Sequence, residues 1–363
     1  MIAVKIEFPG QQIDVANYRR DDGNGAPDER INNTTRTLRY NVLMSEFDLI
    51  TRYFTRTTKP PDKVVLGIGD DCALLQGTSL QQAISTDMLV EGRHFFADAD
   101  PRLLGHKCLA VNLSDLGAMG ARPVGFTLAL SLPAVDDAWL QPFSEGLFAL
   151  ADRYDCTLIG GDTTKGPRII CITVFGEVAQ GKSLRRDAAH IGDDIWVSGA
   201  LGEARLALAH RRGKLLLDDD TLAAAAMRMD APSPRVALGL ALIGIAHAAI
   251  DISDGLAGDL GHILERSRCG ARCRLDALPV GPALRSQPQS TQQEFCASGG
   301  DDYELCFTAP TLQRTAVLEA AAKTGIAVTR IGTIEAEPGL RWQHADGRLL
   351  EHAMTSFDHF CTP

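Results

Sequence analysis

The sequence lacks the long apolar runs of a membrane protein and the leader of a secreted one. No stretch of about 18 or more apolar residues occurs, and the longest apolar run, 236–250, contains His247 and is interpreted as a buried helix. The first residues do not show a basic region followed by an apolar one, so no secretory signal is expected. We therefore expect a cytoplasmic protein without a membrane partner.

Paired cysteines and an excess of basic charge are also missing. No CxxC occurs, and Cys269 and Cys273 have no second pair that would complete a zinc site, so the 9 cysteines are interpreted as reduced thiols. Lys and Arg number 36 against 46 Asp and Glu, a net charge of −10. Because nucleic-acid binding usually needs a basic face, we expect no nucleic-acid partner.

The length and composition predict a globular protein with two folded domains. The chain has 363 residues, of which 45% are hydrophobic, which suits two domains at about 100–200 residues each. Residues 1–43 are polar and are predicted to be a disordered extension or a misassigned start. A helix is expected from Met44, with Ser45 as its N-cap. The domains are predicted at 44–182 and 183–363, each mixing helices and strands.

Apolar periodicity predicts the elements of both halves. Strands are expected at 63–67, 82–86, 124–132, 157–160, 168–178, 303–308 and 326–334, with another that starts the run DIWVSGALGEARLALAHRRG and one that ends at IDISDG. Helices are expected at 101–120, 136–154, 218–229, 234–247, 256–268 and 310–324, with another after the glycine turn of that same run.

Acidic residues recur beside Gly, Ser or Thr at the ends of apolar stretches. They are Asp70 and Asp71 in GIGDD, Asp87 in ISTDML, Asp115 in NLSDLGAMG, Asp162 in IGGDTT, Asp251 and Asp254 in DISDG, and Asp301 and Asp302 in SGGDDYEL. Any one of them can be ordinary turn or N-cap chemistry. Apart from Asp115, which lies in a helical pattern, we expect them at the rim of a sheet. Carboxylates crowded at one rim repel one another unless cations lie among them, so the set predicts several Mg²⁺ ions and a polyphosphate.

Several other enzyme classes lack support in the sequence. GIGDDC has no third glycine of a dinucleotide-binding turn, and the HRD and DFG motifs of protein kinases and the GxSxG of serine hydrolases are absent. DxDxDG calcium loops are absent too. His94 stands apart from the helical histidines, because it lies beside Arg93 in a predicted loop and could contact a substrate phosphate.

Six motifs in a fixed order give the chain a family resemblance. GIGDDCALL, ISTDMLVEGRHF, KCLAVNLSDLGAMGARP, LIGGDTTKGP, DISDGL and SGGDDYELCFT resemble thiamine-monophosphate kinases, members of the PurM-like (aminoimidazole-ribonucleotide-synthetase-like) superfamily. The resemblance runs from Met44 to the end of the chain. It implies a kinase that transfers the γ-phosphoryl of ATP to thiamine monophosphate. It also implies a PurM-like fold with an N-terminal α/β domain, which forms the homodimer interface, and a C-terminal α+β domain.

The resemblance also implies a set of site residues in the cleft between the domains. The implied Mg²⁺ ligands are Asp71, Thr86, Asp87, Asp115, Asp162, Asp251 and Asp254, with Ser85 as a further ligand through its backbone. The implied ATP contacts are Tyr154, Gly161, Arg186 and Ser253, and the implied substrate contacts are His94, Asp301 and Phe357. Arg185 is adjacent to Arg186, so either arginine can be the family's ATP contact. Family members usually have Glu where this chain has Asp301 and Tyr or Trp where it has Phe357, and we expect modest effects on substrate affinity.

The implied acceptor is itself a phosphate, so the chemistry needs no strong general base. The main difficulty is bringing two anions together, which a site rich in Mg²⁺ addresses. We therefore expect direct in-line transfer, with no covalent nucleophile on the protein. The alternatives are another ATP-using PurM-like synthetase and a non-catalytic nucleotide-binding relative. A selenophosphate synthetase would carry a reactive cysteine near the N-terminus, and residues 1–43 contain none.

Overall fold

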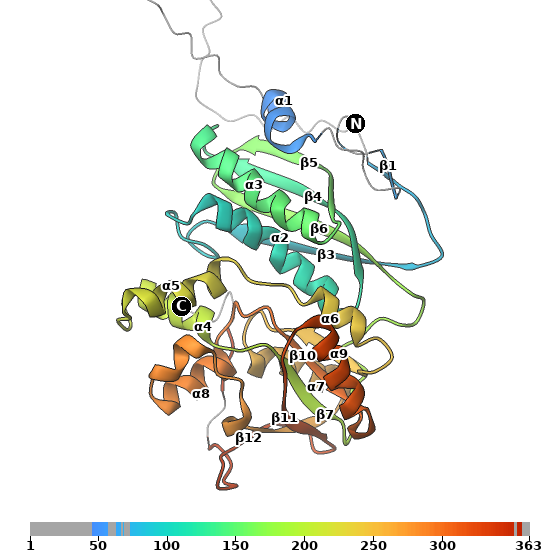
Figure 1. Ribbon diagram of the computed structural model, residues 1–363, viewed down its shortest axis with the longest axis vertical. Helices are drawn as coiled ribbons and strands as arrows, with labels where there is room; N and C mark the ends of the chain where they lie inside the picture. Colours follow the sequence, from blue (N-terminus) through green and yellow to red (C-terminus); the bar gives the residue numbers. More distant parts are fainter. Residues whose placement is uncertain (1–45, 57–62, 67, 69–72, 352–353, 358–363) are drawn as a thin grey trace, which may run out of the picture. The chain divides into compact units, whose positions relative to one another are not determined.

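Two large β-sheets and the helices packed on them make up the described part of the chain (Figure 1). The computed structural model describes residues 46–56, 63–66, 68, 73–351 and 354–357, which belong to one compact unit, Met44–Pro363. Within these ranges no helix has the length and apolar character needed to cross a membrane. The predictions for residues 1–43, Ser45 and Asp71 fall outside the described residues, and the predicted domain boundaries stay predictions.

The first sheet has four strands in the order β3-β6-β4-β5. They are β3 (Gln81–Val90), β6 (Ile169–Val178), β4 (Arg122–Leu132) and β5 (Thr157–Lys165). The pair β4–β5 is parallel and the other two pairs are antiparallel. Helices α2 (Pro101–Ala118) and α3 (Asp137–Arg153) lie over one face, as Figure 1 shows, and their apolar side chains share a core with those of the strands.

Helix α2 is buried around most of its circumference, which marks it as the central helix of the fold. The Asp100 carboxylate caps its start by accepting hydrogen bonds from the backbone N–H groups of Arg102 and Leu103, and Pro101 occupies the first turn. Close backbone approaches fix its neighbours. A Cβ added at Gly239, in α6 (Val236–Ala241), would lie 1.9 Å from the carbonyl oxygen of Gly117 in α2.

The second sheet has six strands in the order β12-β9-β11-β7-β10-β8. They are β12 (Gly339–Gln343), β9 (Gly270–Arg274), β11 (Val328–Glu335), β7 (Asp194–Ser198), β10 (Leu305–Ala309) and β8 (Ala248–Asp251). All pairs are antiparallel except β12–β9. Two separate cores show that the middle of this sheet is covered on both faces, because Ile195 and Val197 of β7 pack in one and Trp196 in the other. That double burial explains the unbroken apolar run of β7.

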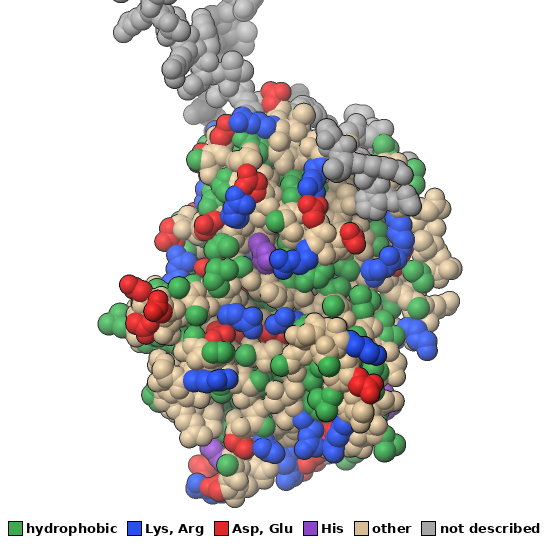
Figure 2. Space-filling view, in the orientation of Figure 1, with side chains coloured by type: hydrophobic (Ala, Val, Ile, Leu, Met, Phe, Trp, Pro, Cys, Tyr) green, Lys and Arg blue, Asp and Glu red, His purple; other side chains and the backbone are tan. Residues whose placement is uncertain are grey.

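Helices cover this second sheet and complete the described elements. They are α4 (Glu203–Arg211), α5 (Asp219–Asp230), α6, α7 (Leu256–Ser267), α8 (Gln289–Ser298) and α9 (Arg314–Thr324), with 3₁₀ turns η2 (Leu275–Ala277), η3 (Pro282–Ser286) and η4 (Thr311–Gln313). Near the N-terminal side lie α1 (Glu46–Leu49), a π-helical turn η1 (Ile50–Phe54) and the small sheet of β1 (Val64–Leu66) and β2 (Leu74–Leu75). On the face drawn in Figure 2, basic and acidic side chains are interspersed, so no large patch of one sign dominates that face.

Most predicted elements are confirmed, with one clear correction. The predicted helix 234–247 ends as α6 at Ala241. Gly244 then adopts a left-handed φ of 78°, and the His247 N–H donates to the Thr308 carbonyl, which starts the pairing of β8. The apolar run 236–250 is therefore a short helix, a turn and a strand. The elements α8, β9 and β12 were not predicted at all.

One string matches the P-loop pattern without having its structure. Residues 176–183 read GEVAQGKS, which fits GxxxxGK[ST]. A phosphate-binding P-loop leads from a strand directly into a helix N-terminus. Here Gly176 is itself paired inside β6, and the next helix, α4, begins only at Glu203. The string is therefore not a P-loop.

Because α2 and α6 are in close contact at Gly239, we expect a side chain at this position to lower the stability of the protein. Replacing Gly239 with Ala should lower the free energy of unfolding by about 2 kcal/mol, because the added methyl meets backbone atoms that cannot move aside. Urea unfolding would measure this. Gly261→Ala in α7 is the matched control: a Cβ there meets nothing within 4 Å, so the higher helix propensity of Ala should leave stability unchanged or raise it by up to about 1 kcal/mol. Equal effects of the two substitutions would contradict the packing argument.

Candidate active site

A cavity of about 910 Å³ lies where α2 and β3 of the first half meet the second half. Its volume is in the range of small-molecule sites. Most of the residues predicted from the sequence line it, namely Thr86, Asp87, His94, Asp115, Asp251, Ser253, Asp254, Asp301 and Phe357. Residues far apart in the chain therefore meet at one site, as the motif pattern predicts.

Four carboxylates from separate elements gather at this cavity: Asp87 from β3, Asp115 from α2, Asp251 from the end of β8, and Asp254 from the turn that follows. Hydroxyl groups from nearby residues hold two of them, since Ser85 donates to Asp115 at 2.5 Å and Ser114 donates to Asp251 at 2.8 Å. The predicted ligand Ser85 thus joins the cluster through its side chain.

The backbone of Asp87 is also fixed. Its N–H donates to the side-chain oxygen of Asn112 in α2, at 3.2 Å, and the amide nitrogen of Asn112 donates back along the helix to the Cys108 carbonyl. Asn112 is buried, so α2 determines where β3 presents its carboxylate. The expectation that these acids lie at the rim of a sheet is wrong for Asp87, which lies within β3.

Burial raises the pKa values of Asp87, Asp115 and Asp251. Burial raises the pKa of Asp87 to about 7, and the charges of Asp115 and Asp254 contribute to the shift. Burial, followed by the charges of Asp115 and Asp259, raises the pKa of Asp251 well above its usual range. Partly buried carboxylates that oppose each other's ionisation are a poor arrangement for stability alone. They do fit Mg²⁺, a hard cation that prefers oxygen ligands.

Asp259 of α7 holds the turn that carries Ser253 and Asp254. One oxygen of its buried carboxylate accepts the backbone N–H groups of Ser253, Asp254 and Gly255, each at 3.1 Å. Burial and the Asp254 charge raise the pKa of Asp259 to about 7. This side chain holds the backbone of the turn but does not itself line the cavity.

The SGGDD turn lines the cavity, and its backbone is strained. Asp301 and Tyr303 both have left-handed φ values, 68° and 50°, which non-glycine residues rarely adopt. The Asp301 carboxylate is held by the Tyr303 hydroxyl at 3.0 Å and by the Lys107 ammonium at 3.2 Å. The Asp301 N–H also donates to the Ser253 carbonyl at 2.8 Å, which joins the two acidic turns.

Lys107 and Tyr303 are site residues that the sequence analysis did not single out. Lys107 is only 4% exposed, yet it lines the cavity with Val111 and Asp115. The signal was available, because residues four apart in a helix lie on one face and these three follow that spacing. Tyr303 lies within the quoted SGGDDYEL motif.

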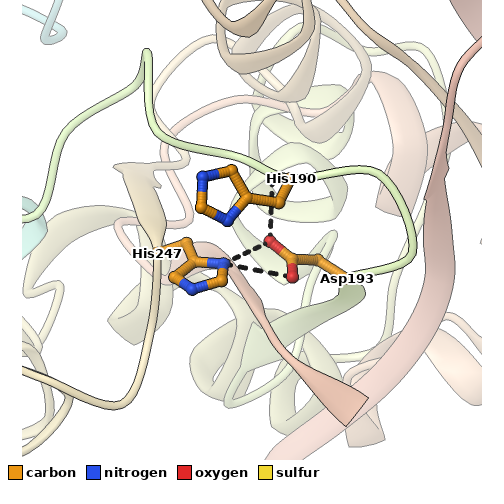
Figure 3. Close-up of side chains that lie close together, drawn as sticks. All are labelled: His190, Asp193 and His247. Atoms are coloured by element: carbon orange, nitrogen blue, oxygen red, sulfur yellow. Dashed lines mark hydrogen bonds and ion pairs between the residues drawn. The ribbon is translucent and has the colours of Figure 1, made fainter.

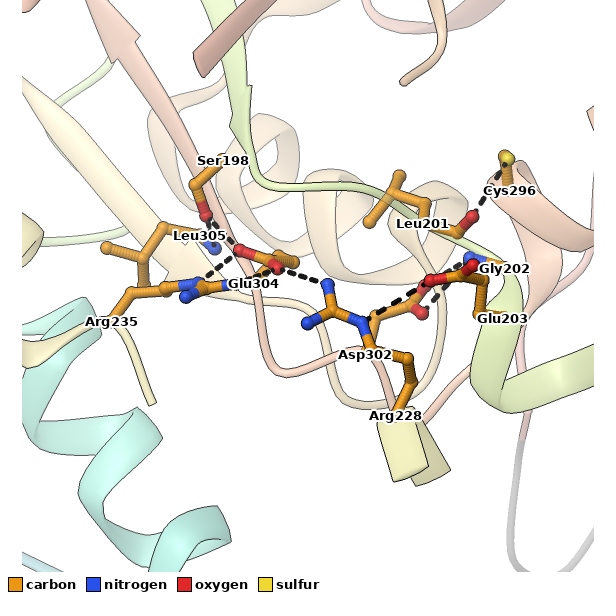
Figure 4. Close-up of polar contacts among 10 residues, drawn as sticks. All are labelled: Ser198, Leu201, Gly202, Glu203, Arg228, Arg235, Cys296, Asp302, Glu304 and Leu305. Carbon is orange, nitrogen blue, oxygen red and sulfur yellow. Dashed lines mark hydrogen bonds and ion pairs between the residues drawn. The ribbon is translucent and has the colours of Figure 1, made fainter. Parts of the chain in front are cut away.

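Asp302 and Glu304 do not line the cavity, and their carboxylates join several segments of the second half (Figure 4). The Asp302 carboxylate accepts the N–H of Gly202, at the start of α4, at 3.0 and 3.1 Å. Glu304 is 1% exposed and accepts hydrogen bonds from Ser198, Arg235 and Arg228. The two adjacent acids of this turn therefore have different roles. Asp301 lines the cavity, whereas Asp302 binds the backbone at the start of α4.

Aromatic and basic side chains also line the cavity. The Arg93 guanidinium lies 4.8 Å from the centre of the Phe357 ring, and the Phe357 N–H donates to the Asp254 carbonyl at 3.0 Å. His94 accepts the Val90 N–H at its Nδ1, which places its ring proton on Nε2. Arg205 and Arg212 of the second half also line the space.

Other predicted residues lie outside the cavity lining. Asp162 is exposed within β5, so its predicted place at a strand end is wrong. In the sheet it pairs with Ala129 of β4, which pairs with Cys171 of β6. Cys171 in turn pairs with Met88 of β3. Side chains alternate along a strand, so Asp162 shares the face of Met88 and not that of Asp87.

Three predicted ATP contacts have other surroundings. Gly161 has a φ of 153°, and an added Cβ would lie 1.9 Å from the Leu128 carbonyl oxygen, which explains the glycine by sheet pairing. Tyr154 donates its hydroxyl to the Pro234 carbonyl at 2.9 Å. Arg186 lies near enough to Asp115 for its charge to oppose the rise of that pKa, whereas Arg185 pairs with Asp187.

Comparison with known proteins identifies the family. The models of AIR synthase related proteins match residues 69–178 (N-terminal domain) and 190–344 (C-terminal domain). A thiamine-monophosphate kinase of Salmonella typhimurium is 47% identical over 322 residues, which is 88% of this chain and 99% of that protein. The chain belongs to the thiamine-monophosphate kinase family.

Solved structures of this family agree with the fold. The crystal structure of thiamine-monophosphate kinase from Stenotrophomonas maltophilia has a TM-score of 0.77 and 46% identity, covering 85% of this chain and 98% of that one. A structure described as AaThiL complexed with AMPPCP and TMP has a TM-score of 0.69 and 28% identity, covering 86% and 96%. The predicted two-domain PurM-like fold is therefore confirmed.

The raised carboxyl pKa values predict a stability that depends on pH and on Mg²⁺. Asp87 binds a proton more tightly in the folded protein than in the unfolded chain, so its contribution is complete below about pH 4 and is lost as the pH rises through about 7. In EDTA, the free energy of unfolding should fall by about 2 kcal/mol between pH 5 and pH 8. Excess Mg²⁺ should reduce this fall, because the ionised carboxylates are then compensated.

Urea unfolding across this pH range, with EDTA or with Mg²⁺, would check the prediction. Asp87→Asn removes one of the titrating groups, so the fall in EDTA should be smaller in that variant. A free energy of unfolding that does not change with pH in EDTA would contradict the proposed crowding of the acids.

Proposed function

We propose that this chain is the kinase that phosphorylates thiamine monophosphate with ATP, giving thiamine diphosphate and ADP. The observation that carries the proposal is one cavity that is lined both by a cluster of partly buried carboxylates and by aromatic and basic side chains. The relatives named above support the choice of substrates, since one is a thiamine-monophosphate kinase by name and another is described as complexed with AMPPCP and TMP.

Mg²⁺ is the cation that the donor set fits. We propose that Asp87, Asp115, Asp251 and Asp254 hold it, with Ser85 beside them. Thr86 lines the cavity, but its hydroxyl pairs with that of Thr173 on the other face of β3, so its role as a ligand stays a prediction. When bound, Mg²⁺ neutralises phosphate charge and orients the terminal phosphate of ATP. The predicted ligands Asp71 and Asp162 stay predictions, because the first is not described and the second lies on the other face of its sheet.

The acceptor phosphate would meet positive charge and hydrogen-bond donors on the chain itself. Lys107, Arg205 and Arg212 line the cavity, and His94 carries its ring proton on Nε2, the form that donates to an anion. Phe357 offers an aromatic face to a ring of the substrate. The roles of Asp301 in substrate binding and of Tyr154, Gly161, Arg186 and Ser253 in ATP binding are part of the same proposal.

Direct in-line transfer suits this site better than a covalent intermediate. A phosphate monoester is anionic near neutral pH, so the attacking oxygen needs no strong base, and positioning with charge neutralisation is the main task. No cysteine among the described residues lines the cavity. The carboxylates, once they hold cations, are poor nucleophiles.

A homodimer formed by the first sheet is the proposed assembly. The face of this sheet away from α2 and α3 exposes apolar side chains, with Ile84 59% and Met88 54% exposed. An apolar sheet face of this kind commonly marks an interface. A cytoplasmic location also stays a proposal, supported by the free thiols of the described cysteines.

A direct assay would test the function. Full-length protein incubated with ATP, Mg²⁺ and thiamine monophosphate should form thiamine diphosphate and an equal amount of ADP, measured by chromatography. Asp87→Asn should lower kcat by about 100-fold or more, a loss comparable to removing one transition-state charge contact. Asp346→Asn, in an exposed turn, is the control and should have wild-type activity.

The other outcomes separate the alternatives. ATP turnover with a different acceptor would keep the fold and replace the substrate, which would favour another ATP-using synthetase. Nucleotide binding without turnover of any acceptor would favour a non-catalytic relative. A labelled protein that forms from γ-labelled ATP and passes its label to product would overturn direct transfer.

The proposed dimer gives a separate prediction. Ile84→Glu places a charge on the exposed sheet face, so the chain should shift from dimer to monomer in analytical ultracentrifugation. Leu312→Glu is the control, because Leu312 is 96% exposed at a 3₁₀ turn of the second half. Wild-type protein that sediments as a monomer would contradict the proposal.

A further inference from the structure

A second cluster of metal-binding side chains lies outside the cavity (Figure 3). His190, Asp193 and His247 each present one ligand atom, and all these atoms lie within 4.8 Å of one another. None of the three lines the cavity or belongs to the motifs quoted above. Their chemistry also differs, since two imidazoles and one carboxylate are typical ligands of zinc, whereas the ligands proposed for the cation of the cavity are oxygen atoms.

The backbone that carries these side chains is held by the middle of the second sheet. Asp193 directly precedes β7 and His247 directly precedes β8, while β10 lies between these two strands and pairs with both. The His247 N–H donates to the Thr308 carbonyl of β10 at 2.8 Å, and the Ile334 N–H of β11 donates to the Asp193 carbonyl at 2.9 Å. The sheet therefore fixes the backbone at Asp193 and His247, whereas His190 lies in the connection between β6 and β7.

Asp193 is the buried centre of the cluster, with 3% of its surface exposed. Its Oδ2 accepts the backbone N–H of His190 at 2.9 Å and the Thr308 hydroxyl at 3.2 Å. Its Oδ1 is contacted by His247 Nδ1 at 3.1 Å, and that is the one hydrogen bond it makes among the described residues. A carboxylate oxygen has two lone pairs, so Oδ1 has the capacity to bind an ion.

The spacing of the side chains is close to that of ligands on one ion. Zinc bonds to nitrogen and oxygen of about 2.0–2.2 Å place two tetrahedral ligands about 3.3 Å apart. His247 Nδ1 lies 2.9 Å from Asp193 Oδ2, and the ring centres of His190 and His247 are 4.1 Å apart. His247 Nδ1 donates its proton to the carboxylate, so an ion bound by both groups would release that proton to solvent. Figure 3 shows the two rings against each other and next to the carboxylate.

We propose that His190, Asp193 and His247 form a binding site for Zn²⁺ or a similar transition-metal ion, separate from the Mg²⁺ site of the cavity. Three protein ligands leave one tetrahedral position for water. The ion would join the starts of β7 and β8 and so act on the stability of the second half. It takes no part in the transfer reaction. Burial, together with the charge of Asp193, raises the pKa of the Cys269 thiol, which shows that Cys269 is near this carboxylate.

Zinc titration of the full chain tests the site. Protein stripped with a chelator is titrated with Zn²⁺ by calorimetry in excess Mg²⁺, which occupies the oxygen ligands of the cavity but competes poorly for imidazole. We expect one equivalent to bind per chain and the melting temperature to rise. His190→Gln and His247→Gln should each weaken zinc binding by at least about 100-fold. Losing a residue that only hydrogen-bonds to a metal ligand already lowers metal affinity by about 10–100-fold.

Controls separate this site from the cavity and from misfolding. His262→Gln removes an exposed histidine of α7 and should bind zinc as the wild type does. Asp87→Asn should also keep this binding. Circular dichroism and the kinase assay check that the histidine variants are folded, since neither residue belongs to the proposed active site. Co²⁺ in place of Zn²⁺ should give the strong visible bands of a tetrahedral ion.

The proposal is overturned if wild-type protein binds no zinc under these conditions, or if both histidine variants bind it as tightly as the wild type. A loss confined to one histidine would also overturn the three-residue site. Zinc binding that is lost in Asp87→Asn would assign the ion to the cavity. The kinase result does not enter this decision, so failure of the proposed function and failure of this site can be told apart.

Discussion

The repulsion among buried carboxylates is the constraint on which the rest of this structure depends. Asp87, Asp115, Asp251 and Asp254 come from β3, α2, the end of β8 and the turn after it, and burial raises the pKa values of Asp87, Asp115 and Asp251. A fold that gathers them needs rigid supports and a cation that compensates their negative charge. The hydroxyl groups of Ser85 and Ser114, the amide of Asn112 and the neighbouring Lys107–Asp301 pair supply the first, and Mg²⁺ is the proposed second.

The supports are arranged around α2. This helix contributes Lys107 and Asp115 to the cavity, and it approaches α3 and α6 at glycines where no side chain would fit. A Cβ at Gly105 would lie 2.1 Å from the Phe143 carbonyl oxygen in α3. Glu304 plays the matching part in the second half, where it joins Arg228 and Arg235 to the sheet. The acids are thus placed by backbone contacts and buried ion pairs and not by the turns alone.

The sequence predicted much of this fold, because strong periodicity has a local cause. The helix expected at 101–120 is α2, and the strand expected at 124–132 is β4, within two residues at each boundary. Elements with weak patterns were missed, such as β9, which alternates apolar residues with arginines over only five positions. The run 236–250 misled because a buried helix and a buried strand are equally apolar.

The site was predictable as a list of residues but not as a geometry. Motif order indicated Asp87, Asp115, Asp251 and Asp254 together, yet it could not tell which face of a strand a residue takes. Asp87 and Asp162 both lie within strands of one sheet, and only the register shows that they point to opposite faces. Lys107 escaped notice because its significance comes from a partner far along the chain. Spacing within one helix could have suggested its direction, but not its contact with Asp301.

The long separation of these partners in sequence also bears on how the protein folds. Ser114 and Asp251 are 137 positions apart, and their hydrogen bond closes a loop that includes parts of both halves. Contacts of such separation form slowly, because the entropy of closing the loop is lost before the contact is gained. Each sheet can pair its own strands first, and the acids meet only when α2 and β8 come together. The cavity is therefore among the last parts of the molecule to be completed, and nascent or partly unfolded chains would lack it even where both sheets are intact.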